Sequence, residues 1–305
     1  MALDPELEAI VAEVPGWAGR DLVATPLPGG ITNRNVRVEV DGEAFVVRIP
    51  GRDTELLGID RRAEHAAALA AAEAGVGPDV VAFVPSRGAL VTRFLEGAAP
   101  IPEVELRTRT ALEPVVRAVR AFHACPPIPG RFPVFRVIER YREVAEERGV
   151  AIPSAYDEAH AVAARIEAAF SATPITPVPC HDDLLNANLL RRDGRVWLVD
   201  FEYAGMGDPY FDLANLAVNN GLDEPAQDLL LELAFGAATD ARRARLALMR
   251  IVSDLREAMW GVVQQGISTL DVDYVDYAER HFARCLASAS DERVGAWLDA
   301  VRGGA

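Results

Sequence analysis

The stretch that decides the fold is "HDDLLNANLLRRDGRVWLVDF", residues 181–201. Its two apolar runs flank Arg191-Arg192-Asp193-Gly194, which predicts a short β-hairpin. Asp183 and Asn188 are five positions apart, and Asp200 follows Asn188 by twelve. Such crowding of carboxylates and amides around a hairpin indicates either a polar turn with incidental acidic residues or a site that holds something cationic.

The residues before this stretch predict a small α+β unit at the N-terminus. Apolar alternation and turn signals predict two strand groups and one alanine-rich helix, which begins after Asp60 and ends at Gly75. A short N-terminal helix precedes them. The predicted strands are Leu22–Leu27, Val36–Val40, Ala44–Ile49, Val80–Val84 and Ala89–Phe94, with turns at Pro28-Gly29-Gly30 and Asp41-Gly42.

The remaining chain is mainly helical by its apolar periodicity. The segment "LEGAAPIPEVE", residues 95–105, reads as a linker before it. We therefore expect an α+β, bilobal protein-kinase-like fold: an antiparallel sheet lobe with one helix over residues 1–96 and a larger, mainly helical lobe over 97–305. Ligands bind preferentially in the cleft between two such lobes. The predicted helices are 105–124, 136–148, 154–169, 224–235, 240–265, 273–287 and a short final one.

Composition narrows the function classes. The chain has 305 residues and a net charge of −15, so a nucleic-acid partner is not expected and a neutral or cationic small molecule fits better. No apolar run reaches the length of a membrane span. Cys125, Cys180 and Cys285 lie far apart, which favours a reduced, cytoplasmic protein. All 31 basic residues are arginines, so any site that usually employs lysine must use arginine or do without.

The spacing within residues 181–201 suits phosphoryl transfer from ATP. That reaction needs hard oxygen ligands for Mg²⁺ and a carboxylate that orients the attacking hydroxyl. Kinases place an Asp in the catalytic loop, an Asn five positions on, and a second Asp after the next hairpin. Asp183, Asn188 and Asp200 have that order, and His181 can brace the loop. The ordered set is far more specific than a single Asp–Asn pair.

With these motifs, the sequence resembles the aminoglycoside phosphotransferase and choline kinase superfamily, and within it the choline/ethanolamine kinases. The resemblance runs in order over most of the chain. It is carried by "GGITNRNVRV" (29–38), "FVVRIPG" (45–51), "RRAEHAAAL" (61–69), "GVGP" (75–78), "AFH" (121–123), "HDDLLNANLL" (181–190), "VDFEYAGMGDPYFDLAN" (199–215) and "WGVVQQGISTLDVDYVDYAERHF" (260–282).

The resemblance implies roles for the catalytic residues. Asp183 is the expected catalytic base, and Asn188 and Asp200 are the expected Mg²⁺ ligands. Arg48 occupies the strand position where protein kinases place a phosphate-binding lysine, and its fork suits a phosphate. Glu64 in the next helix is expected to orient Arg48 as an ion pair.

The resemblance also implies a nucleotide site. The "PGGITNRN" turn is expected to cover the triphosphate with backbone N–H groups, and Asn33 is the side chain expected to add a polar contact. The adenine is expected to lie against the hinge residues Arg93, Phe94 and Leu95. Asp212 is expected to brace the catalytic loop.

The acceptor site is expected on the C-terminal helices. Trp260 and Tyr277 match aromatic positions near the pocket where choline kinases hold a quaternary ammonium. This chain departs from those kinases at positions where they carry other, often aromatic, residues. Glu202 adds a carboxylate near the expected acceptor face. The departures are Asn219, Asn220, Glu257 and Val272, and the first three suit a primary ammonium or a polyhydroxylated acceptor.

The sequence thus predicts an ATP- and Mg²⁺-dependent small-molecule kinase that phosphorylates an amino alcohol such as choline or ethanolamine. An aminoglycoside or sugar phosphotransferase on the same scaffold is the alternative, and a pseudokinase that only binds a ligand is the reading from a different class. The acceptor, the nucleotide preference and the oligomeric state stay open.

Overall fold

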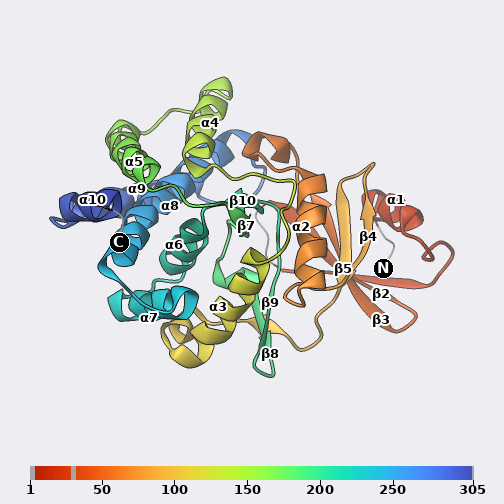
Figure 1. Cartoon of the computed structure of the whole chain (residues 1–305). Helices are drawn as coiled ribbons and strands as arrows, with labels where there is room; N and C mark the ends of the chain where they lie inside the picture. The colour runs from red at the N-terminus through yellow and green to blue at the C-terminus, as the bar shows by residue number, and fades with distance from the viewer. Residues whose placement is uncertain (1–3, 29–31, 304–305) are drawn as a thin grey trace.

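The computed structural model describes residues 4–28 and 32–303, and these form a sheet lobe and a helical lobe side by side (Figure 1). The predicted α+β architecture, with an antiparallel sheet at the N-terminus, is confirmed. The N-terminal lobe contains α1 (Pro5–Glu13), β1 (Leu22–Pro26), β2 (Asn33–Val40), β3 (Glu43–Pro50), α2 (Arg61–Glu73), β4 (Val80–Val84) and β5 (Ala89–Arg93).

The five strands form one antiparallel sheet in the order β1-β2-β3-β5-β4. Strand alternation divides the side chains between two faces. Val36, Val38 and Val47 lie on one face, in a separate small core with α1 and Trp17. Arg48 pairs with Asn35 and Leu90 across the sheet and so lies on the opposite face, toward the C-terminal lobe.

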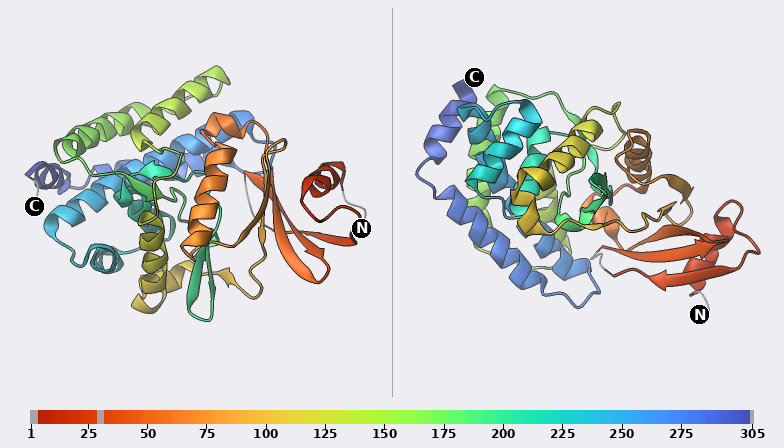
Figure 2. Two further views of the ribbon diagram at one scale, coloured as in Figure 1. Left: turned by 45° about the vertical axis from the view of Figure 1, so that its right-hand side comes forward. Right: turned by 90° about the horizontal axis from the view of Figure 1, so that it is seen from below.

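Helix α2 lies between the sheet and the C-terminal lobe (Figure 2, left). The Asp60 carboxylate caps it by accepting from the Arg62 and Ala63 N–H groups at 2.8 and 3.3 Å, a contact worth about 1 kcal/mol. Its alanine face joins the main core, which continues into the helical lobe. The Leu198 N–H donates to the Val76 carbonyl at 2.7 Å, which fixes the end of α2 against the later hairpin.

The C-terminal lobe is arranged around one long helix, α8, which packs against α4, α6, α9 and α10. Its elements are β6 (Ala99–Pro100), α3 (Arg109–His123), α4 (Val134–Glu147), α5 (Ala155–Ala172), β7 (Val178–Cys180), β8 (Leu189–Arg192), β9 (Arg195–Leu198), β10 (Gly205–Gly207), α6 (Pro209–Asn219), α7 (Glu224–Phe235), α8 (Asp240–Ile267), α9 (Tyr274–Ala289) and α10 (Val294–Gly303).

Three sequence predictions differ from the structure. The helix expected over 105–124 is divided, because Thr108 is extended and caps α3 through the Ala111 N–H. The expected linker contains Ala99–Pro100, which pairs with β8. Helix α6 is an element that the sequence reading did not assign, although Asp208 caps it and Pro209 is its first residue.

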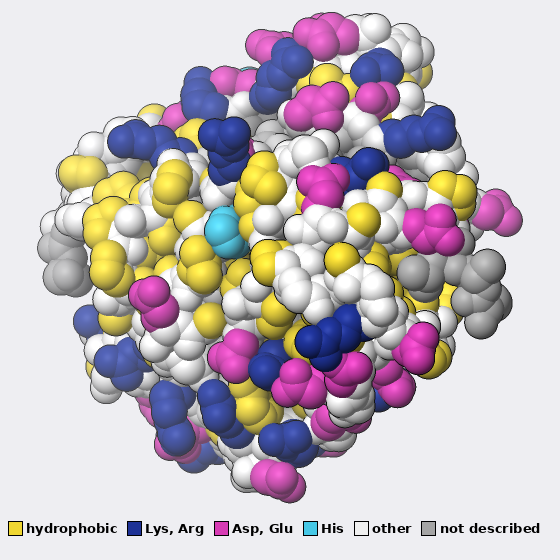
Figure 3. Space-filling model, turned by 90° about the vertical axis from the view of Figure 1, so that its right-hand side faces the viewer, with side chains coloured by type: hydrophobic (Ala, Val, Ile, Leu, Met, Phe, Trp, Pro, Cys, Tyr) yellow, Lys and Arg dark blue, Asp and Glu magenta, His cyan; other side chains and the backbone are white. Residues whose placement is uncertain are grey.

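The surface of the sheet lobe and the apolar character of the helices bear on the expected partners. Acidic and arginine side chains are interspersed over the face of the sheet lobe that Figure 3 shows, with no broad basic area on that face. Among the helices of the described residues, none combines the length and the apolar character needed to cross a bilayer.

Candidate active site

The β8–β9 hairpin brings the expected metal ligands together. Leu189 pairs with Leu198, and the Val199 N–H donates to the Asn188 carbonyl at 3.1 Å. Asn188 therefore stands where the hairpin begins and Asp200 where it ends, on adjacent backbone positions. Asp200 adopts a φ of 69°, in the left-handed region that Asp tolerates better than most residues.

Two side chains of α6 hold the catalytic loop by its backbone. The Asp212 carboxylate accepts from the His181 N–H at 2.9 Å and from the Asp182 N–H at 2.7 Å. The Asn215 side-chain oxygen accepts from the Leu184 N–H at 2.6 Å. Asp212 thus braces the loop, as expected, and Asn215 is a second anchor that the sequence reading did not single out.

His181 and His123 complete this support. His181 Nδ1 lies 3.3 Å from the Asp183 N–H, and Nε2 lies 2.9 Å from the Val199 carbonyl. Burial lowers the pKa of His181, so its neutral Nε2–H form fits both contacts. Burial opposes ionisation of Asp212, but the hydrogen bond from His123 at 2.8 Å helps to keep the Asp212 pKa below its usual value.

Asp183 lies partly exposed beside Asn188. The Asn188 amide nitrogen donates to the Asp183 backbone carbonyl at 2.9 Å and to its carboxylate at 3.1 Å. Burial raises the pKa of Asp183 well above its usual range, while the charge of Arg256 opposes the increase. Because the Asn188 nitrogen is used in this way, its side-chain oxygen is left to act as an acceptor or ligand.

The side-chain oxygens of Asn188 and Asp200 fit Mg²⁺. They are hard oxygen donors, which Mg²⁺ prefers. Adjacent backbone positions at the base of the hairpin hold them, and one Asp200 oxygen already meets a cation, the Arg48 guanidinium. The chemistry of these two side chains and their place at the base of the hairpin therefore suit this ion.

Six side chains meet between the lobes, and we call them the interlobe cluster: Asn33, Arg48, Arg61, Glu64, Asp200 and Glu202. Arg48 forms ion pairs with Glu64 and with Asp200, and the Glu64 side chain is only 2% exposed. Glu64 is therefore placed to orient Arg48. The cluster contains two arginines and three carboxylates, so an added cation or phosphate would change its charge balance.

Arg61 is the member that the sequence reading missed. It donates to Glu64 at 2.7 Å, to the Asn33 side-chain oxygen at 2.8 Å and to Thr54 at 3.0 Å, and it pairs with Glu202 at 3.3 Å. Arg61 stands at the first position of α2, three residues before Glu64, and that spacing was the available signal.

Glu202 lies in the interlobe cluster. The Asn33 amide nitrogen donates to its carboxylate at 2.7 Å. Burial and the neighbouring charge of Asp200 raise the pKa of Glu202 to about 7, against the charges of Arg48 and Arg61. Its expected role on the acceptor face stays a prediction. The contacts to Asn33 and Arg61 show that Glu202 also faces the N-terminal lobe.

The hinge residues lie at the other end of the cleft. The Phe94 N–H donates to the Ala44 carbonyl at 3.0 Å, and the Arg37 guanidinium lies 4.9 Å from the Phe94 ring centroid. Arg93 pairs with Glu43 at 3.0 Å and is turned toward solvent, and Leu95 begins the connection to the C-terminal lobe. The expected phosphate-covering turn includes residues 29–31, which lie outside the described residues.

A second group lies within the C-terminal lobe, and we call it the helix cluster: Tyr203, Asn215, Arg256, Glu257, Trp260 and Tyr277. The structure brings together the expected Glu257, Trp260 and Tyr277. The Tyr277 hydroxyl donates to Glu257 at 2.9 Å, and the two aromatic rings meet edge to face at 5.4 Å. The Trp260 N–H donates to the Tyr203 hydroxyl at 2.8 Å.

Arg256 and Asn215 are members of the helix cluster that the sequence reading missed. Arg256 donates to Glu257 at 2.8 Å, and the Asn215 amide nitrogen lies 3.2 Å from the same oxygen. Burial opposes ionisation of Glu257, but Arg256, His281 and the Tyr277 hydroxyl hold its pKa below the usual value. The low pKa favours the ionised carboxylate of Glu257, and the Arg256 guanidinium beside it balances its charge. Asn220, which the sequence reading placed near the acceptor, instead donates to the Leu184 carbonyl at 2.9 Å.

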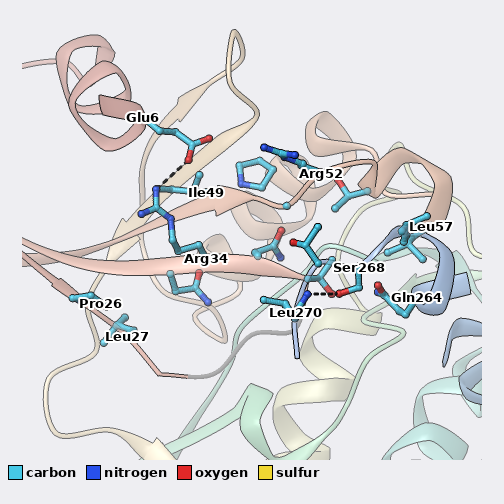
Figure 4. A pocket seen from close by; sticks show the side chains of 18 residues that line it. Glu6, Pro26, Leu27, Arg34, Ile49, Arg52, Leu57, Gln264, Ser268 and Leu270 are labelled. Atoms are coloured by element: carbon cyan, nitrogen blue, oxygen red, sulfur yellow. Dashed lines mark hydrogen bonds and ion pairs between the residues drawn. The ribbon is translucent and has the colours of Figure 1, made fainter. Parts of the chain in front are cut away.

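A cavity of about 320 Å³ opens at the end of β2 and β3, opposite the C-terminal end of α8 (Figure 4). Asn33 and Thr54 line it and also contact Arg61, so it adjoins the interlobe cluster. Gln264 and Ser268 line its other wall. None of Glu257, Trp260 and Tyr277 is among its described lining residues.

Known proteins share the sequence pattern and the fold of this chain. The profile of the phosphotransferase enzyme family matches residues 23–248. A solved choline/ethanolamine kinase family protein from Mesorhizobium loti is 33% identical, covers 98% of this chain and 99% of its own, and superposes with a TM-score of 0.84.

Two curated relatives extend the comparison. Protein LicA of Haemophilus influenzae is 30% identical over 210 residues, which are 67% of this chain and 60% of the relative. Ethanolamine kinase 2 of Mus musculus is 25% identical over 301 residues, which cover 88% of this chain and 76% of the relative. The matched region thus spans less than two thirds of the LicA protein.

Proposed function

The chain belongs to the phosphotransferase enzyme family, in its choline/ethanolamine kinase branch, and from this membership we propose that it transfers the γ-phosphate of ATP to the hydroxyl of an amino alcohol such as choline or ethanolamine. The observation that carries the proposal is the hairpin that places Asn188 beside Asp200 while α6 holds Asp183 by the loop backbone.

In the proposed reaction the acceptor oxygen forms a bond to the γ-phosphorus, and the bond from that phosphorus to the β,γ-bridging oxygen breaks. ADP leaves with the electron pair of the broken bond. Asp183 orients the hydroxyl and accepts its proton, which then passes to solvent. The products are ADP, the phosphorylated acceptor and one proton.

The nucleotide is proposed to lie along the cleft from the hinge to the interlobe cluster. The backbone at residues 93–95 would meet the adenine, and Arg48 would hold phosphate oxygens while Glu64 orients its guanidinium. Asn33 would contribute a polar contact beside the phosphates. Asn188 and Asp200 would hold Mg²⁺, which supplies charge neutralisation to the phosphates when it is bound.

The acceptor is proposed to lie between Asp183 and the helix cluster. The edge-to-face rings of Trp260 and Tyr277 offer aromatic surface to a cationic group. The branch membership supports an amino alcohol over an aminoglycoside or a sugar.

An acceptor profile tests the proposal. Purified protein with ATP and Mg²⁺ would be assayed for ADP formation with choline, ethanolamine, an aminoglycoside and a small sugar, with mass spectrometry of the products. We expect a phosphorylated amino alcohol and no turnover when Mg²⁺ is omitted. Turnover of the aminoglycoside or sugar alone would replace the proposal with the alternative, and ATP binding without any turnover would favour the pseudokinase reading.

A further inference from the structure

We propose that the acceptor of this enzyme is an amino alcohol that also carries a carboxylate, and that the Arg256 guanidinium binds that carboxylate. The inference rests on the proposed kinase function and deepens it by naming the substrate class. Arg256 lies on α8 next to Glu257, and it is 1% exposed, the largest of the fully buried side chains.

One edge of the Arg256 guanidinium is suited to bind a carboxylate. Nη1 donates to Glu257 at 2.8 Å. Within residues 4–28 and 32–303, neither Nε nor Nη2 has a hydrogen-bond partner. Nε–H and the adjacent Nη2–H form the side of the planar fork that binds both oxygens of a carboxylate at once. The two unpartnered donors are therefore a matched pair.

The aromatic neighbours of Arg256 do not replace this partner. Its guanidinium carbon lies 4.4 Å from the Tyr203 ring centroid and 5.5 Å from that of Phe132. Such contacts attract the positive charge to the ring face, but they supply no oxygen to the in-plane N–H groups. A buried donor without an acceptor costs about 1–3 kcal/mol, and more when it is charged, so a ligand that supplies the acceptor gains that energy.

The position of Arg256 connects it to the reacting group. It lies in the helix cluster with Glu257, Trp260 and Tyr277, and its positive charge acts to lower the pKa of Asp183 against the effect of burial. Glu257 accepts from Arg256, Asn215 and Tyr277, so it has little capacity left for an acceptor. The guanidinium edge is the polar group in this cluster that still needs a partner.

The unpartnered edge does not suit a quaternary ammonium. A trimethylammonium group has no hydrogen-bond acceptor to offer the two N–H groups. An acceptor with a hydroxyl toward Asp183 and a carboxylate toward Arg256 satisfies both ends. L-Serine is ethanolamine with a carboxylate added, so these two compounds form a matched pair of probes, and L-homoserine extends the carboxylate by one methylene.

The test compares kcat/KM for L-serine, L-homoserine, ethanolamine and choline in the wild type and three variants. We expect one of the two carboxylate acceptors to exceed ethanolamine by at least about tenfold, the size of a charged bidentate contact. Arg256→Leu should remove that preference: kcat/KM for the carboxylate acceptor should fall by at least about tenfold more than kcat/KM for ethanolamine. Arg256→Lys keeps the charge beside Glu257 but lacks the fork, so it should reduce the preference even if the Leu variant does not fold.

Arg250→Leu is the matched control. Arg250 lies on the same helix, has an unpartnered Nε among the described residues, and contacts Gln227 at 3.3 Å. Its replacement should leave the preference unchanged. Turnover of ethanolamine or choline above both carboxylate acceptors, with a ratio that Arg256→Lys does not alter, would overturn this inference alone. Absence of turnover with every amino alcohol would instead overturn the proposed function.

Discussion

The interlobe cluster joins two lobes through ion pairs, whereas the helix cluster lies within one lobe, on α6, α8, α9 and the segment between β9 and β10. In the interlobe cluster, Arg48 and Arg61 share one glutamate, and each also contacts a carboxylate of the 200–202 segment. In the helix cluster, Arg256 and Glu257 are sequence neighbours that neutralise each other.

Under the proposed function, the interlobe cluster serves phosphate transfer and the helix cluster serves the choice of acceptor. The interlobe cluster is held by backbone geometry: a hairpin, a strand register and a helix cap fix where its charges lie. The helix cluster depends on side chains on helix faces, where a single substitution changes the ligand that fits. Variants in the two clusters should therefore affect ATP and the acceptor separately.

The largest expected effect is at Asp183, which lies between the two clusters. Asp183→Asn removes the group proposed to accept the hydroxyl proton, so kcat should fall by about 10²–10⁴-fold. The Asn188 contact to the Asp183 backbone carbonyl remains, so ATP affinity by calorimetry should change little. Asp193→Asn in the exposed hairpin turn is the control. A loss of folding in the Asp183 variant would contradict this assignment.

The next effect isolates the interlobe cluster. Arg61→Ala removes contacts to Asn33, Glu64 and Glu202, which leaves buried polar groups unpaired. The KM for ATP should rise by about 10–100-fold, while the acceptor KM stays nearly constant. Steady-state kinetics with each substrate varied in turn would measure both.

Arg62→Ala is the control for this variant. Arg62 is exposed on the same first turn of α2, so its removal should leave both KM values unchanged. Equal effects of the two substitutions would show that the cluster does not position the nucleotide.

The helix cluster should give the opposite pattern. Glu257→Gln weakens the partner of Arg256 and Tyr277 without touching the interlobe cluster. The acceptor kcat/KM should fall by about tenfold, the value of one charged contact, and the KM for ATP should stay constant. If the KM for ATP rose instead, the separation of the two clusters would be wrong.

Local signals explain which parts of the fold could be predicted. The strands followed from alternation and from turns such as Asp41-Gly42, and the 224–235 helix was predicted with the bounds it has. The prediction of one helix over 105–124 was wrong, because the Thr108 hydroxyl caps a new helix within the apolar pattern. Helix α6 carried a local signal, Asp208 before Pro209, which the motif-based reading passed over.

The residues of the candidate site also include some that the sequence could predict and some that it could not. Asp183, Asn188 and Asp200 were selected by spacing, because a hairpin converts a fixed spacing into adjacency. Arg61 carried a local signal, its spacing to Glu64, although its contacts across the lobes could not be predicted. Arg256 could not be selected, because its contacts depend on the one-residue register along a helix. The contacts of Glu202 could not be predicted from local sequence either: its neighbours come from residues 33 and 61, far away in the sequence.

The smallest expected effect concerns Asp182, the neighbour of Asp183. Its side chain is fully buried, its φ is 64°, and neither carboxylate oxygen has a well-formed hydrogen bond within the described residues. Burial raises the pKa of Asp182 well above 3.8, so the folded protein binds this proton more tightly than the unfolded chain. The free energy of unfolding should therefore fall as the pH rises above about 4.

Asp182→Asn keeps the shape of the side chain, tolerates the left-handed backbone and removes this pH dependence. The variant should therefore be more stable than the wild type by about 1–2 kcal/mol at pH 7.5 and by much less near pH 4. Urea denaturation at both pH values measures the difference, and an equal effect at the two would exclude titration of this carboxyl as its source.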